Sequence, residues 1–183
     1  LATEAVQELR IKHRWEAIDL ENEILKQAKD KKSKLEIEVF ENGDTRKQLL
    51  ARSRYLLYKS MEKWTQSQKL RAKILFREYL DLEVAYNLSD GLRKIYNQNI
   101  TKSAAMLKLA HWFKDIEESG FKSFTILKNT ITNHYNTILN YFETRSTNAS
   151  AESFNAKIKN FRLQLRGVKD KAFFLFRLSQ IFA

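Results

Sequence analysis

Apolar residues recur at spacings of three, four and seven along most of the chain, with polar residues between them. This periodicity is typical of amphipathic helices and differs from the alternation of a half-buried strand. One segment, residues 35–40, does alternate and predicts a short strand. The predicted helices cover residues 1 to about 30, 49–57, 70–79, about 80–96, 106–116, about 121–145, about 148–166 and a last stretch from 169.

Turn and capping residues mark several ends of these helices. Asn42-Gly43 is a turn signal, and Asp44 or Thr45 after it is predicted to cap the next helix. Thr65 opens a capping-box pattern. Gly120 is predicted to end the helix before it. Short connections between helices predict a compact helical array.

The composition supports an all-α fold and excludes several classes of site. The 183 residues contain no Cys, no Pro and four Gly. Disulfide scaffolds, cysteine zinc sites and thiol nucleophiles are therefore excluded. Strand-rich folds and Gly-rich phosphate loops require more turn residues than this. Within the helical pattern, Gly91 is predicted to interrupt or strain the helix over residues 80–96.

The charge balance points to a polyanionic partner. Lys and Arg number 33 against 22 Asp and Glu, which gives a net charge of +11. Residues 145–183 hold eight cations and two acids, so this short segment alone carries +6. No apolar run reaches the length of a membrane span, and no signal peptide opens the sequence.

Residues 148–166 carry the most informative polar pattern. At about 100° of rotation per residue, five polar side chains fall within a stripe roughly 80° wide. A row of cations on one helix face suits a phosphodiester backbone, although an ordinary solvated face has the same pattern. The polar stripe is Glu152, Asn155, Lys159, Arg162 and Arg166, and the neighbouring apolar stripe is Phe154, Ile158, Phe161 and Leu165.

This segment resembles the end of the DDE transposases of the ISL-three insertion-sequence family. The motif is Asn148-x-x-x-Glu152-x-x-Asn155-x-x-Ile158-Lys159, followed by Arg166-Gly167-Val168 and an aromatic helix. Upstream segments fit the same family, so the resemblance covers essentially the whole chain. The upstream segments are residues 9–22, 48–57, 109–112 and 119–124.

The resemblance implies a ribonuclease-H-like catalytic core interrupted by a helical insertion. In this family two Asp and one Glu bind two Mg²⁺ or Mn²⁺ ions, which activate water or a 3′-hydroxyl for attack on DNA. The resemblance places Glu152 as the third carboxylate. The second Asp belongs to an Asp-x-Phe-His-like motif, and no Phe-His pair occurs in this sequence. We therefore expect a C-terminal portion of the enzyme that is inactive by itself.

The resemblance also implies a domain organisation and partners. Residues 1–30 are expected to be the first core helix, 31–145 an all-helical insertion, and 146–183 the core helices that carry Glu152. Asn155 would orient the carboxylate or contact DNA, and Lys159, Arg162 and Arg166 would bind phosphates. The implied partners are terminal-repeat and target DNA and further copies of the chain, in the bacterial cytoplasm and on the nucleoid. The alternative is a stand-alone helical nucleic-acid-binding or scaffold module.

Three further expectations concern the aromatic residues and the last helix. Trp15, Trp64 and Trp112 are predicted to lie in the core, because aliphatic residues flank them at helical spacing. Cations near Tyr55 and Tyr58 form a possible second DNA contact or an ordinary solvated face. The helix from residue 169 is apolar nearly all round, so it predicts dimerisation or exposed apolar surface.

Overall fold

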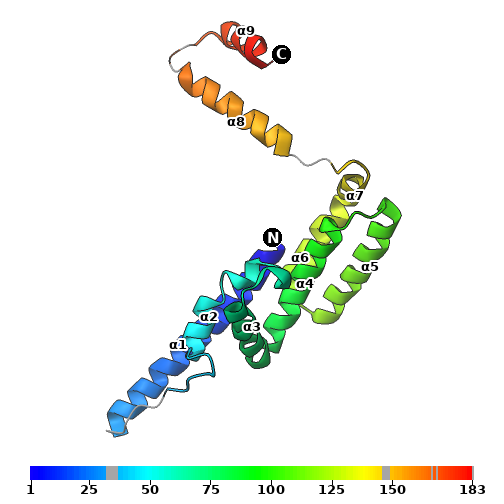
Figure 1. Cartoon of the computed structure of the whole chain (residues 1–183). Coiled ribbons are helices and arrows are strands. Elements are labelled where there is room, and N and C mark those ends of the chain that lie inside the picture. The colour runs from blue at the N-terminus through cyan, green and yellow to red at the C-terminus, as the bar shows by residue number, and fades with distance from the viewer. Residues whose placement is uncertain (32–36, 146–148, 166, 168, 183) are drawn as a thin grey trace. The chain divides into compact units, whose positions relative to one another are not determined.

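The structure is a computed structural model that describes residues 1–31, 37–145, 149–165, 167 and 169–182. It divides into two compact units, Leu1–Phe142 and Glu143–Ala183 (Figure 1). The described residues form helices and contain one isolated bridge, between Val39 and Thr45, and no strand. The predicted all-α fold is confirmed.

The first unit is built on the long helix α1, Ala2–Lys31. One side of α1 packs on α2 (Arg46–Arg52), α4 (Leu80–Asn97) and α6 (Lys122–Asn133). Small residues on this side, such as Val6 and Ala17, are buried and allow close approach of the helices.

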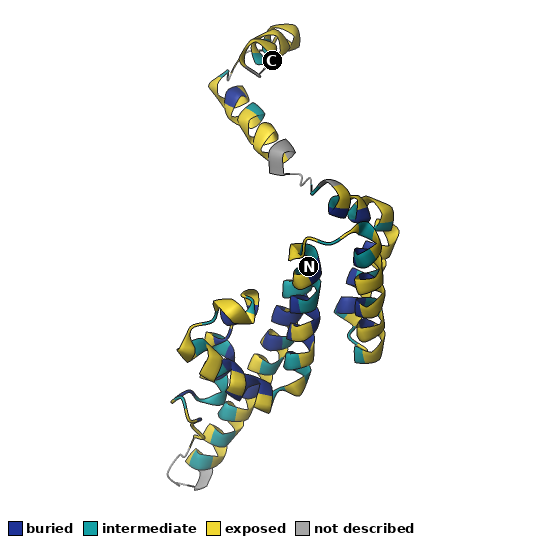
Figure 2. Cartoon of the chain, turned by 45° about the vertical axis from the view of Figure 1, so that its right-hand side comes forward, coloured by how far each residue is buried: buried dark blue, intermediate teal, exposed yellow. Residues whose placement is uncertain are grey.

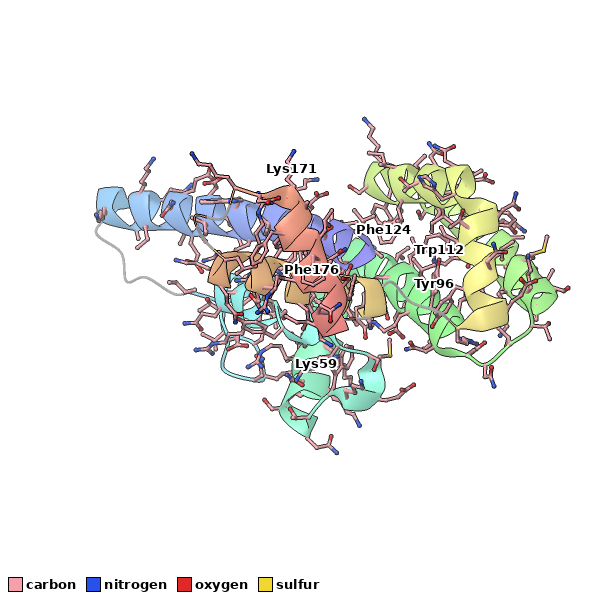
Figure 3. All side chains as sticks on the ribbon, turned by 90° about the horizontal axis from the view of Figure 1, so that it is seen from above. Lys59, Tyr96, Trp112, Phe124, Lys171 and Phe176 are labelled. Carbon is pink, nitrogen blue, oxygen red and sulfur yellow. The ribbon has the colours of Figure 1, made fainter. Side chains whose placement is uncertain are left out.

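Helix α4 is the centre of the first unit, because α1, α3 and α5 all pack against it. Its Tyr86 is fully buried, and its Leu88 carbonyl accepts a 2.8 Å hydrogen bond from the Trp112 indole. Figure 3 labels Trp112 together with Tyr96 and Phe124, which also pack in the first unit. The remaining elements are the 3₁₀ turns η1 (Leu56–Tyr58) and η2 (Met61–Lys63), and the helices α3 (Gln66–Glu78), α5 (Lys102–Ser119) and α7 (Tyr135–Thr144).

The predicted helix caps at Thr45, Thr65 and Gly120 are confirmed. Thr45 and Thr65 form capping boxes with Gln48 and Gln68 at the starts of α2 and α3. Gly120 ends α5 with a φ of 69°, a left-handed conformation that glycine adopts without steric cost.

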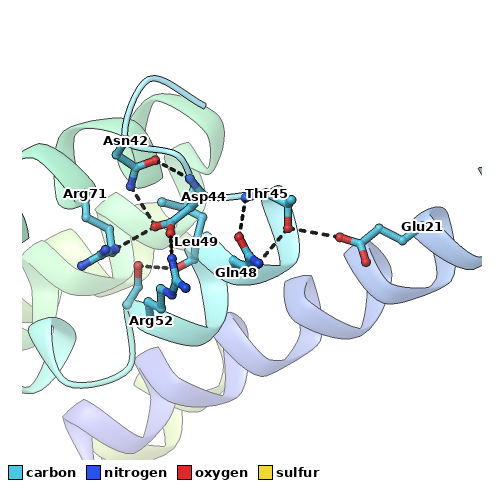
Figure 4. Close-up of polar contacts among 9 residues, drawn as sticks. Glu21, Asn42, Asp44, Thr45, Gln48, Leu49, Arg52 and Arg71 are labelled. Atoms are coloured by element: carbon cyan, nitrogen blue, oxygen red, sulfur yellow. Dashed lines mark hydrogen bonds and ion pairs between the residues drawn. The ribbon is translucent and has the colours of Figure 1, made fainter. Parts of the chain in front are cut away.

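Asp44, in the connection before α2, forms ion pairs instead of capping the helix. Its carboxylate is fully buried and forms ion pairs with Arg52 and with Arg71 of α3, the latter at 2.9 Å (Figure 4). The Asn42 amide donates a further hydrogen bond of 2.8 Å to it. These contacts around the buried Asp44 carboxylate join α2, α3 and the turn.

Four local predictions are wrong. The described residues 37–40 are irregular apart from one bridge at Val39 and form no strand; residues 35 and 36 lie outside the described part. The helix through residues 49–57 ends at Arg52, and Leu56 and Leu57 lie in η1. Helix α4 runs unbroken through Gly91. The helix over 121–145 is two helices, α6 and α7, which are separated at His134.

The aromatic prediction is correct for two of the three tryptophans. Trp112 is buried and Trp64 is half-buried against Tyr86. Trp15 is 61% exposed on the outer side of α1. Periodicity identifies an apolar stripe, but it does not show whether another element covers that stripe.

The second unit contains α8 (Ala149–Gln164) and α9 (Lys171–Phe182). Gly167 lies between them with a φ of 95°, and the Asp170 carboxylate accepts a 2.8 Å hydrogen bond from the Ala172 N–H at the start of α9. Most of both helices is exposed (Figure 2). The exposed apolar surface expected for the last helix is present, and dimerisation stays a prediction. The exposed apolar residues of α9 are Phe173, Leu175, Phe176 and Ile181.

The three-part domain division stays a prediction. Along the sequence, the boundary between the two observed units lies between residues 142 and 143, close to the predicted boundary at 145. The predicted first core helix and insertion lie together in the first unit, since α1 packs on α2, α4 and α6.

Candidate functional site

Helix α8 presents its predicted polar stripe to the solvent. Glu152, Asn155, Lys159 and Arg162 are all exposed. Glu152 lies in the first turn, where the partial positive charge of the helix N-terminus favours a carboxylate. Arg166, the fifth predicted residue of the stripe, lies outside the described residues.

The apolar stripe of α8 explains this orientation. Phe161 is 8% exposed, and its ring centroid lies 5.7 Å from that of Phe174 in α9. Ile158 and Leu165 are half-buried on the same side of the helix. Phe154, at the start of the helix, is 44% exposed. Packing on α9 therefore fixes which face of α8 is free to bind a partner.

An open groove of about 980 Å³ lies between α8 and α9. Lys159 and Arg162 line it from α8, and Lys169 and Lys171 line it from the start of the next helix. Asp170 is the one acidic residue among its described lining residues, and its carboxylate caps α9. The charged residues of the groove are therefore mainly cations, and they lie beside apolar walls formed by Ile158, Leu163, Leu165, Phe174 and Leu175. The excess of positive charge suits an anionic chain such as a phosphodiester backbone.

Lys169 and Lys171 are candidate DNA-binding residues that the sequence analysis did not identify. They follow the Gly167 turn and lie outside α8. The helical periodicity of α8 therefore cannot predict that they lie in the same groove as Lys159. The available signal was the net charge of the whole segment 145–183.

The described residues do not complete a metal site. They contain no group of three or more His, Asp or Glu side chains that could hold a metal ion. The exposed carboxylate of Glu152 could supply one oxygen ligand of the kind that Mg²⁺ and Mn²⁺ prefer. A two-ion site would therefore need further carboxylates from outside the described residues.

A helix that carries an exposed carboxylate in its first turn and cations along a groove further on is suited to a polyanionic substrate. Comparison with protein families matches residues 1–178 to a family described as a transposase, of the DDE type in the ISL-three group. The chain belongs to this transposase family. No curated protein and no solved structure matches it.

Membership of the family establishes the general activity. The protein is a transposase or part of one, its partner is DNA, and DDE transposases in general use divalent metal ions. Among the described residues, no helix is both long enough and apolar enough to span a membrane.

Proposed function

We propose that this chain supplies one catalytic carboxylate, Glu152, and part of the DNA-binding surface of a DDE transposase. The observation that supports this proposal is the position of Glu152 at the exposed start of the helix whose Lys159 and Arg162 line the cationic groove. The family match extends across this helix. The remaining acidic ligands would come from a ribonuclease-H-like core.

The polar stripe divides into two proposed roles. Asn155 lies about one turn after Glu152, so its amide is within range to orient the carboxylate or to contact DNA. Lys159 and Arg162 bind backbone phosphates, and Arg166 at the end of the same sequence stripe is proposed to do so too. Lys169 and Lys171 extend this phosphate contact along the groove.

The chain of residues 1–183 should not cleave terminal-repeat DNA with Mg²⁺ or Mn²⁺. A single carboxylate gives too few ligands for a two-ion site, and the described residues contain no acidic cluster. The measurement is gel analysis of end-labelled DNA after incubation with the purified chain. The full-length transposase containing this chain is the positive control. Cleavage by the chain alone that depends on Glu152 would contradict the proposal.

Lys159→Ala should weaken binding of the chain to duplex DNA and reduce its dependence on salt. Loss of one phosphate contact lowers the slope of log K against log salt by about one unit. Fluorescence anisotropy with a labelled duplex at several salt concentrations measures both quantities. Lys157→Ala is the matched control, because Lys157 is an exposed lysine of α8 outside the polar stripe. Equal effects of Lys159→Ala and Lys157→Ala would show that DNA affinity depends only on the net charge of the chain, which would contradict a specific phosphate contact at Lys159.

A further inference from the structure

The first unit contains a buried arginine whose protein partners are neutral. Arg10 of α1 is 5% exposed, and its guanidinium donates to Gln7 Oε1 at 2.7 Å and to the Leu50 carbonyl at 2.9 Å. Both acceptors are uncharged oxygens, so these contacts fix the side chain without neutralising it. A buried charge without a carboxylate partner is costly, and it raises the positive potential of the surface above it.

Two further arginines lie close to Arg10. Burial lowers the pKa of Arg10, and the nearby positive charges of Arg14 and Arg54 lower it further. In the described part of the chain neither Arg14 nor Arg54 forms an ion pair with a carboxylate, and Arg54 lies over the ring of Tyr55. The Arg54 carbonyl accepts a 3.1 Å hydrogen bond from Gln7, which anchors this loop to α1. Among the described residues, no carboxylate forms an ion pair with any of these three neighbouring arginines.

Tyr58 connects these arginines to a second group of cations. It is close enough to Arg10 to affect its pKa, and it also lines an open pocket of about 510 Å³. Lys59, Lys63 and one exposed carboxylate, Glu62, line the pocket from the η1–η2 segment, and Figure 3 labels Lys59 on this segment. In the described residues no carboxylate pairs with Lys59 or Lys63. Exposed lysines without protein partners are available to an external anion.

The other wall of the pocket carries two further cations, Arg93 and Lys94, which share one carboxylate. Arg93 of α4 donates to the Tyr58 carbonyl at 3.1 Å and to the buried Asp90 at 2.9 Å. Lys94 Nζ lies 2.9 Å from the other carboxylate oxygen of Asp90. Asp90 is only 2% exposed and positions these two cations. Its single negative charge neutralises one of their two charges, so Arg93, Lys94 and Asp90 together keep a net charge of +1.

We propose that this basic surface of the first unit binds the phosphate backbone of duplex DNA, separately from α8. The residues that solvent reaches on this surface are Arg14, Arg54, Lys59, Lys63, Arg93 and Lys94, and Arg10 lies buried close to Arg14 and Arg54. Several cations spread over α1, the η1–η2 segment and α4 suit a chain of phosphates better than one small anion. The inference does not depend on the role of Glu152.

The test removes three exposed cations that form no ion pair in the described part of the chain. In the full chain, R54A/K59A/K63A should bind a labelled duplex at least about tenfold more weakly at moderate salt. The slope of log K against log salt should fall by about three units, one for each lost phosphate contact. The matched control K26A/K29A/K114A removes three exposed lysines elsewhere in the first unit and should leave the slope nearly unchanged. Circular dichroism and thermal melting verify that both variants fold.

Two comparisons separate this surface from the α8 groove. The effect of R54A/K59A/K63A should persist when Lys159 and Arg162 are also replaced by Ala, because the two surfaces contribute independently. The charge-conserving variant R54K/K59R/K63R should retain binding. The proposal is overturned if the folded triple variant binds like the parent chain, or if the control loses as much. A failure of Glu152 to act in catalysis would leave these results unchanged.

Discussion

Glu152→Gln in the full-length transposase should abolish cleavage of terminal-repeat DNA while DNA affinity changes little. The amide keeps the size of the side chain but loses the charge with which a carboxylate binds a divalent cation. Losing only an outer partner of a metal ligand costs about 10–100-fold in activity, so losing the ligand itself should cost more than 100-fold. Glu152 is exposed at the helix start, so the substitution should not disturb packing.

The matched control for this result is Glu118→Gln. Glu118 is an exposed carboxylate of α5 whose contact is a 3.6 Å surface pair with Lys114. A surface pair of this kind contributes little to stability, so the control enzyme should cleave at the parent rate. Cleavage rates come from end-labelled DNA under single-turnover conditions, and anisotropy measures affinity. Normal cleavage by the Glu152 variant would exclude its catalytic role.

Asp44→Asn should destabilise the first unit by roughly 3 kcal/mol, because it removes the buried carboxylate charge that Arg71 and Arg52 share. Arg71 is 19% exposed and Arg52 is 55% exposed, so water compensates part of the loss. At roughly 2–4 °C per kcal/mol, the melting temperature should fall by about 6–12 °C. Thermal unfolding followed by circular dichroism measures this change. Glu41→Gln, at an exposed ion pair with Arg77, is the control and should leave melting nearly unchanged.

Asp44 also gives the first unit a defined dependence on pH. Burial raises the pKa of this carboxyl, but the hydrogen bonds and charges of Arg71 and Arg52 outweigh burial and lower it below the ordinary value of 3.8. Its contribution to the free energy of unfolding is therefore present above pH 3.8 and is lost as pH falls through the lower folded pKa. Asp44→Asn should flatten this acid limb of the stability curve. An unchanged limb would contradict the role of the ion pairs.

The sequence predicts the helices well because their signals are local. Helical periodicity locates α1, α4 and α5, and the capping boxes at Thr45 and Thr65 locate two helix starts. These signals involve residues within one or two turns of each other, so the sequence alone contains them. The exposed polar face of α8 follows from periodicity for the same reason.

The breaks between helices were harder to predict because tertiary contacts decide them. Leu56 and Leu57 continue an apolar pattern, but the chain turns into η1, and the Trp64 indole donates to the Leu56 carbonyl at 2.8 Å. The break at His134 has no Gly or Pro to mark it. Gly91 remains helical because α5 packs beside it, with the Trp112 ring 3.7 Å from where a Cβ would lie.

The two cationic surfaces could be predicted only in part. Lys159 and Arg162 share one helix face and follow from rotation about its axis. Lys169 joins them only after the chain turns at Gly167. In the first unit, Arg10 and Arg54 are 44 positions apart in the sequence, and only the fold brings them together.

The most direct test of the central claim is the binding of Mn²⁺ to the full-length transposase, followed by electron paramagnetic resonance titration. If Glu152 is a metal ligand, the Glu152→Gln enzyme should bind Mn²⁺ more weakly, or bind fewer ions, than the parent and the Glu118→Gln control. Identical Mn²⁺ titrations for the parent and the Glu152→Gln enzyme would contradict the assignment.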